Sequence, residues 1–321
     1  MKFNFQTIKH RKKYIIFSSI MVISSLIFFF VTPLNLSVDF KGGELLQLQF
    51  KQELNKDKLN NTLEGLEKDI PQLNARRLQY SEGNTIVVRT EQLQENQKAL
   101  LKEKVKEQVG EFDVIKNDTV GPTIGKELAA NALKALGIGA ILIIIYVTIR
   151  FEFVYAIAGL IALLHDVIIT AGLIALFRFE INTPFIAAIL TILGYSINDT
   201  IVVFDRIREN EEKEGKNKDY GVIIDESINQ VFVRSMYTSI TTTISVLMLL
   251  LFGGETLRTF SMALFIGMIF GTYSSVFLAS PLVYVMRKIR KPKKNNKSKN
   301  DSNSRSGKII NGYDEKDKVL V

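Results

Sequence analysis

The stretch PFIAAILTILGYSINDTIVVF, which runs from Pro184 to Phe204, decides the fold class of this chain. It is long enough for a membrane-spanning helix, because a hydrocarbon core about 30 Å thick requires roughly 20 apolar residues at about 1.5 Å per residue. The stretch contains one acidic residue, Asp199, whose burial in lipid is costly. We therefore expect a spanning helix that turns Asp199 toward the interior of a helix bundle.

Five further apolar stretches of similar length lie on either side of this one, approximately at residues 14–31, 133–149, 154–177, 231–252 and 260–286. Most of them are separated by short polar connections, but residues 32–128 intervene between the first two. The sequence therefore predicts an α-helical polytopic membrane protein with six transmembrane helices. One soluble domain lies between the first and second helices, and residues 129–290 form a five-helix membrane domain.

Residues 32–128 show the alternating patterns of a mixed domain. Strands are expected at 45–50, 75–79, 85–90 and 111–116, and helices at 56–69 and 92–109. The resulting order βαββαβ is that of a ferredoxin-like α+β unit, in which two helices cover one face of an antiparallel sheet.

Lys and Arg residues gather at alternate ends of the predicted spans: before the first, and after the second, fourth and sixth. These ends share one side of the membrane, which the positive-inside rule assigns to the cytoplasm. The pattern predicts a multi-pass protein of the cell (plasma or inner) membrane with both termini cytoplasmic. Residues 1–13 are then a cytoplasmic N-terminus, residues 32–128 are extracytoplasmic, and the polar residues 291–321 are a disordered, basic cytoplasmic tail. The first span is expected to remain as an anchor, because residues 32–35 offer no small-residue cleavage site.

The composition limits the chemistry. The chain has no cysteine and only two histidines, His10 and His165, so we expect neither disulfides nor a metal site built on such ligands. Topology accounts for the net charge of +8, and we therefore expect no nucleic-acid partner. No cofactor and no catalytic constellation is predicted.

Ionisable residues inside the spans are the candidates for function. Asp199 lies in the fourth span, Asp166 lies in the third, and Arg234 lies at a depth comparable with Asp199 on the next, oppositely directed helix. An Asp199–Arg234 ion pair is sterically possible and would couple protonation to conformation; the alternative is a pair that only fixes helix register. Neighbouring polar residues are supporting candidates, namely Asn198, Thr200 and His165. Gly267 and Gly271 are expected to allow close helix packing.

Several short strings of the chain occur together in one known family. They are residues 39–43 (DFKGG), 120–122 with Gly125, 164–166 (LHD), 194–209 (GYSINDTIVVFDRIRE), 227–230 with 234–235, and 271–275 (GTYSS). With these strings in this order, residues 8–290 resemble the SecD/SecF family of protein-export membrane subunits, and within it the SecF-type members. That family belongs to the resistance-nodulation-division superfamily. No family string covers residues 211–221 or the tail.

The resemblance implies a subunit that is half of a two-part machine. SecD would supply six further spans, and the complex would act with the SecYEG channel, and accessory subunits such as YajC, on a translocating unfolded polypeptide. It implies use of the proton motive force, or of a sodium gradient, to promote late-stage translocation of preproteins. The family residues that match Asp199 and Arg234 belong to the ion pathway, with Asp166 as a further candidate.

Three alternatives remain open from the sequence. A small-molecule or ion transporter of the same superfamily would share a buried aspartate, although such proteins carry much larger outside domains. An intramembrane aspartyl protease would use Asp166 and Asp199 as a dyad, but the Gly-x-Gly-Asp string of such enzymes is missing. A passive scaffold of the export channel would need neither carboxylate.

Overall fold

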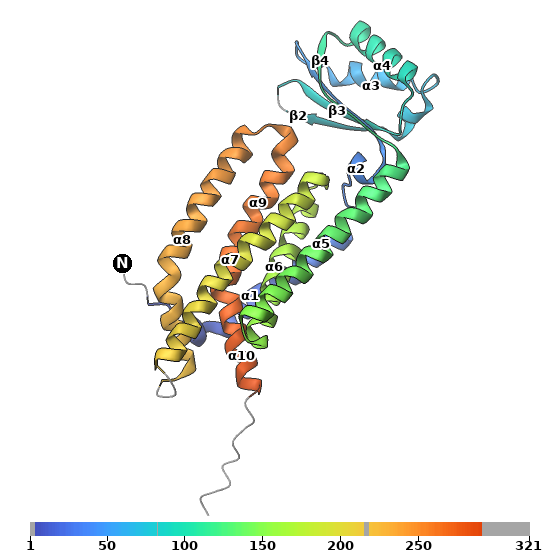
Figure 1. Ribbon diagram of the computed structural model, residues 1–321. Coiled ribbons are helices and arrows are strands. Elements are labelled where there is room, and N and C mark those ends of the chain that lie inside the picture. Colours follow the sequence, from blue (N-terminus) through green and yellow to red (C-terminus); the bar gives the residue numbers. More distant parts are fainter. Residues whose placement is uncertain (1–3, 82, 215–217, 291–321) are drawn as a thin grey trace, which may run out of the picture.

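The computed structural model describes residues 4–81, 83–214 and 218–290. Within them, six helical segments are long and apolar enough to cross a membrane, and they pack as one bundle (Figure 1). Five are the helices α1, α5, α6, α7 and α8, and the sixth joins α9, a π-helical turn η3 and α10. Their bounds are Thr7–Val31, Pro122–Arg150, Phe153–Leu176, Thr183–Glu214 and Tyr220–Phe252, followed by Glu255–Ser274, Ser275–Ala279 and Ser280–Arg290. The predicted six-span fold is confirmed.

Helix α6 lies at the centre of the bundle. More than half of its apolar window is buried, 56%, against 6% for α5 at the periphery. Small residues let its neighbours approach closely. Ala158 and Ala162 are completely buried, and a Cβ atom on Gly172 would lie 2.6 Å from Cα of Ser25, so α1 crosses α6 in direct backbone contact. The outer faces of α1, α5 and α8 are apolar and exposed, as a lipid environment requires.

The soluble domain sits at one end of the bundle, displaced toward α5 (Figure 1). Its antiparallel sheet has the strand order β2-β3-β1-β4, with β1 Gly43–Phe50, β2 Arg77–Ser81, β3 Thr85–Thr90 and β4 Phe112–Val120. Helices α3 (Lys56–Gly65) and α4 (Glu95–Gln108) cover one face and bury an apolar core that includes Leu46, Leu59, Ile86 and Leu101. A 3₁₀ helix η1, Pro71–Ala75, precedes β2. The expected βαββαβ order is therefore confirmed, with the two helices on one face of the sheet.

The chain enters and leaves this domain through adjacent strands. Gly43 at the start of β1 pairs with Val120 at the end of β4, and the short helix α2 (Val38–Lys41) packs on the beginning of α5. Gly42 has φ 76°, a conformation that L side chains rarely adopt, and a Cβ atom there would lie 2.8 Å from Cα of Pro122. Gly42 of the DFKGG string thus allows the two connections to lie backbone against backbone.

A buried ionic cluster joins three elements of the soluble domain. Lys98 on α4 places Nζ 3.1 Å from Oε1 of Glu44, 2.9 Å from Oε1 of Glu95 and 2.9 Å from Oγ1 of Thr119. Burial alone lowers the pKa of Lys98, but the hydrogen bonds and charges of Glu95 and Glu44 together raise it above its ordinary value. The cluster ties α4 to β1 and β4 at the end of the sheet that faces the bundle.

Several elements extend beyond the apolar windows that predicted them. Helix α7 continues to Glu214 and α8 begins at Tyr220, and their polar ends are paired: Asn210 Nδ2 donates to Ser227 Oγ at 2.8 Å and to Gln230 Oε1 at 2.9 Å. Strand β4 continues to Val120 because β1, its partner, begins at Gly43. The expected tail at 291–321 lies outside the described residues.

Candidate ion-coupling site

Asp166 is the centre of a buried polar network. Its side chain is completely inaccessible, yet both carboxylate oxygens have partners. Ser196 on α7 and Ser274 on α9 donate hydroxyl hydrogen bonds to Oδ2 at 2.6 and 2.8 Å, and Nδ1 of His165 lies 2.8 Å from Oδ1. Because buried charges require hydrogen-bonded partners, this arrangement can hold a carboxylate inside the membrane domain. The network joins three helices at one carboxyl group.

The sixth helix changes its winding beside this carboxyl group. The π-helical turn η3 begins at Ser275, whose hydroxyl donates to the Gly271 carbonyl at 2.8 Å and lies 2.9 Å from Oγ1 of Thr200. A Cβ atom on Gly271 would lie 3.2 Å from Cβ of Ser196 and 3.6 Å from Oδ2 of Asp166. The expected close packing at Gly271 is therefore observed. Single π turns inside α-helices are frequent at functional sites.

His165 connects the network to the outside of the bundle. Its ring is 3% exposed and stacks on Tyr273, and its Nε2 atom has no hydrogen-bond partner among the described residues. The ring lines a mainly apolar cavity of about 420 Å³ between α1, α6 and the sixth helix. Ser18 also lines this cavity and donates to the Tyr273 hydroxyl at 3.3 Å. The predicted supporting residue thus lies in contact with Asp166.

Asp199 lies on α7, beside α8. It is 9% exposed, and Oδ2 has no hydrogen-bond partner within the part of the chain that the structure describes. The Ser235 hydroxyl of α8 is its polar neighbour. Thr200 is buried and belongs to the Asp166 network, whereas Asn198 is exposed and lies away from it. Asp199 is therefore a buried carboxyl group with an open hydrogen-bonding position.

The structure does not bring Arg234 into an ion pair with Asp199. Consecutive helix residues point about 100° apart, so Ser235 faces Asp199 while Arg234 is exposed on the surface of α8. The two side chains lie on adjacent helices, as the sequence predicts, but the expected pairing is absent from this conformation.

The two aspartates do not form a dyad. Asp166 directs its oxygens to His165, Ser196 and Ser274, and Asp199 is turned toward α8. An aspartyl protease requires two carboxyl groups that share one proton, and this geometry lacks that contact. Ser196, Ser235 and Ser274 lie in the family strings, but they were not among the site residues predicted from the sequence.

The chain matches two family profiles. Residues 100–289 match "Protein export membrane protein SecD/SecF, C-terminal", and residues 27–53 match "SecD/SecF GG Motif". The chain is 51% identical over 290 residues to the protein translocase subunit SecF of Sebaldella termitidis, a match that covers 90% of this chain and 94% of the relative. It is 38% identical to the protein translocase subunit SecDF of Thermus thermophilus, over 84% of this chain and 37% of that one.

A solved structure agrees with these sequence matches. The crystal structure of Thermus thermophilus SecDF, described as a translocon-associated membrane protein, superposes with a TM-score of 0.80 at 33% identity. The superposition covers 90% of this chain and 39% of the SecDF chain. Sequence, fold and the order of the motifs agree, and the chain belongs to the SecD/SecF family of protein-export membrane proteins.

Proposed function

We propose that this chain is the SecF-type half of a SecD–SecF complex, and that the complex uses a proton or sodium gradient to promote late-stage translocation of preproteins through SecYEG. The observation that carries this proposal is the buried Asp199 carboxyl group with an open position on Oδ2, beside the Asp166 network. A buried, incompletely satisfied carboxyl group is costly inside a membrane domain, and its presence there favours a functional role such as an ion pathway. Members of the family are named as translocase subunits, which supplies the process that the ion movement would drive.

We assign the ion-coupling role to Asp199 and Arg234, with Asp166 as a second carboxyl group on the route. His165 and Thr200 support it through the Asp166 network, and Asn198 supports it from the surface of α7. Arg234 would reach Asp199, or a carboxyl group of the partner, in another conformation. Its exposure in the isolated chain supports a partner surface along α8.

The partner proposal is supported by the relatives. The match covers 94% of the SecF of Sebaldella termitidis, whereas the superposition covers 39% of the SecDF chain, and this difference favours SecD as the partner subunit. The assembly would lie in the plasma or inner membrane with both termini cytoplasmic, as the distribution of Lys and Arg favours. SecYEG, accessory subunits such as YajC, and the unfolded polypeptide complete the expected set of partners.

Asp199→Asn tests the proposal, because it keeps the shape and removes the titrating group. In vesicles that contain SecD and SecYEG, we expect gradient-stimulated export to fall at least tenfold while export driven by ATP alone continues. Thr191→Val is the matched control, since Thr191 lies on the same helix, is exposed, and among the described residues bonds its own helix carbonyl at Ala187 alone. Measuring export with a proton gradient alone and with a sodium gradient alone identifies the coupling ion. Full gradient-stimulated export by Asp199→Asn, with SecD association intact, would instead establish the passive scaffold.

A further inference from the structure

The segment Asn35 to Asp39 follows α1 and includes the first two residues of α2; we call it the strap. It lies along residues 177–182, the loop that joins α6 to α7. Leu36 and Ile181 form a parallel β-bridge. The Ser37 amide donates to the Ile181 carbonyl at 2.9 Å, and the Ile181 amide donates to the Asn35 carbonyl at 2.8 Å. The strap therefore pairs with the loop through backbone hydrogen bonds, although more than 140 residues separate them in the chain.

Asp39 extends this pairing to the first residue of α7. Its Oδ2 atom accepts a hydrogen bond from the Thr183 amide at 2.9 Å, where α7 begins. A carboxylate at a helix N-terminus is stabilised by the helix dipole and satisfies an amide that has no partner within the helix. Asn182 caps the same end by accepting from the Phe185 amide at 3.0 Å. Asp39, from the DFKGG string, thus provides a cap from the strap to the helix that carries Asp199.

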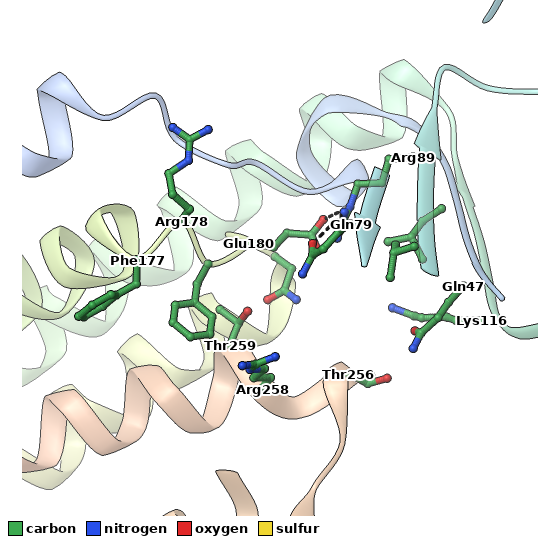
Figure 2. A pocket seen from close by; sticks show the side chains of 14 residues that line it. Gln47, Gln79, Arg89, Lys116, Phe177, Arg178, Glu180, Thr256, Arg258 and Thr259 are labelled. Atoms are coloured by element: carbon green, nitrogen blue, oxygen red, sulfur yellow. Dashed lines mark hydrogen bonds and ion pairs between the residues drawn. The ribbon is translucent and has the colours of Figure 1, made fainter. Parts of the chain in front are cut away.

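The sheet itself contacts the loop through Arg89 and Glu180 (Figure 2). Arg89 on β3 donates from Nε to Glu180 Oε1 at 2.8 Å, and Nη2 bonds the second carboxylate oxygen. The side chains are only 12% and 14% exposed, and Gln79 on β2 accepts from Nη1 of Arg89 at 3.1 Å. Bidentate arginine–carboxylate pairs are strong and fix geometry. The pair borders a cavity of about 240 Å³ between the sheet and the bundle.

The loop is well placed to transmit movement. It joins α6, which carries His165 and Asp166, to α7, which carries Asp199. Arg178 follows the end of α6 and has a left-handed backbone conformation, with φ 59°, which turns the chain into the loop. Its carbonyl accepts a hydrogen bond from Asn35 Nδ2 of the strap at 3.1 Å. A displacement of the extracytoplasmic end of α7 would therefore carry the strap and the sheet with it.

We propose that the strap and the Arg89–Glu180 pair form a coupling that stays closed throughout the transport cycle, so that α7 and the soluble domain move as one body. Asp39, Arg89 and Glu180 are then positioning residues for gradient-driven export. This inference rests on the proposed function, since it concerns how ion binding at α7 would reach the extracytoplasmic side.

The absence of cysteine from the sequence allows a direct test. In the full chain, Leu36→Cys with Ile181→Cys places two thiols at bridged positions, where a disulfide has suitable geometry. After oxidation, in vesicles with SecD and SecYEG, we expect gradient-stimulated export within twofold of the unmodified chain. Loss of export on oxidation that is restored by a reductant would show that the strap has to open, and would overturn the proposal.

Variants that break the coupling should lose gradient-stimulated export. We expect Asp39→Ala, which removes the acceptor for the Thr183 amide, and Glu180→Gln each to reduce gradient-stimulated export at least fivefold, without changing ATP-driven export or SecD assembly, and to slow disulfide formation between positions 36 and 181. The exchange Arg89→Glu with Glu180→Arg should recover at least half of the export that either single change loses. Full gradient-stimulated export by both Asp39→Ala and Glu180→Gln would overturn the coupling. Failure of the unmodified chain to respond to any gradient would instead reject the proposed function.

Discussion

The hydroxyl of Ser274 lies 2.8 Å from Oδ2 of Asp166, one residue before the sixth helix enters its π turn. This contact fixes the sixth helix against α6 at the most buried carboxyl group of the bundle. Ser196 of α7 donates to the same oxygen, so a change in the charge of Asp166 would alter the contacts among α6, α7 and the sixth helix.

Ser274→Ala removes one of the two hydroxyl donors to Asp166. A hydrogen bond to a charged group contributes about 1.5–3 kcal/mol, so we expect gradient-stimulated export to fall roughly tenfold. Ser280→Ala is the matched control, because Ser280 is a buried serine on the same continuous helix whose hydroxyl has no partner among the described residues. Equal export by the two variants would show that the Asp166 contact has no part in coupling.

Gly271→Ala should disturb the same site by steric means. The added Cβ atom would lie 3.2 Å from Cβ of Ser196, which is closer than ordinary van der Waals contact, and α9 would have to move away from α7. We expect the melting temperature of the full chain in detergent and gradient-stimulated export both to fall. An added Cβ atom on Gly137 of α5 would meet no atom of the described residues within 4 Å, so Gly137→Ala should lower neither. A melting temperature that is unchanged in Gly271→Ala would contradict the packing argument.

Gly42→Ala tests the junction between the soluble domain and α5. Alanine is strained at φ 76°, and its Cβ atom would collide with the backbone of Pro122, so we expect a loss of at least about 2 kcal/mol in the free energy of unfolding of the soluble domain. Protease resistance of residues 43–120 in the full chain measures this loss. Gly65→Ala, at the end of α3 with open space around its Cβ position, is the control and should retain full resistance.

Glu44→Gln leaves the buried Lys98 ammonium with one exposed carboxylate, Glu95. Removing one partner of a buried pair is strongly destabilising, and we expect a loss of about 3 kcal/mol, measured by the same protease resistance. The paired change Glu44→Leu with Lys98→Met removes both charges and should lose much less. A smaller loss for Glu44→Gln than for the paired change would reject the ion pair as the cause.

The pH dependence of this cluster follows from the raised pKa of Lys98. A lysine whose folded pKa lies above its unfolded value of about 10.4 stabilises the fold fully below that pH, and this contribution disappears as the pH rises through the folded pKa. Protease resistance of residues 43–120, followed with subtilisin from pH 8 to pH 11, should therefore decline at the alkaline end. Lys98→Met should decline less over the same interval.

The sequence predicted the spans and the mixed domain because both depend on local patterns. Apolar length alone identifies a spanning helix. Five of the predicted stretches lie wholly inside their helices, and the sixth, 154–177, extends one residue past the end of α6 at Leu176. Strand β3, Thr85–Thr90, has the predicted bounds, since its run of β-branched residues directly follows the turn residues Gly83 and Asn84. The end of β4 was missed because it depends on pairing with β1, which is distant in the chain. The ends of α7 and α8 were missed because polar side chains, not apolar ones, hold them together.

The site was harder to predict than the spans. Depth along a helix follows from sequence, so Asp199 and Arg234 were correctly placed on neighbouring helices, but the direction in which each side chain points depends on how the helices are rotated in the bundle. For the same reason Ser196 and Ser274 could not be distinguished from serines that bond only their own helix carbonyls. The Asp166 network is a property of three packed helices, and no single span reveals it.

The pairing of Gly43 with Val120 also determines when the soluble domain can be completed during biosynthesis. Val120 is followed almost directly by α5, which begins at Pro122, so the last strand becomes available only as the second spanning helix is being synthesised. Until then β1 lacks its β4 partner, and the nascent domain presents an unprotected sheet edge of the kind that promotes aggregation. Insertion of the second span and closure of the sheet are therefore expected to be nearly simultaneous events.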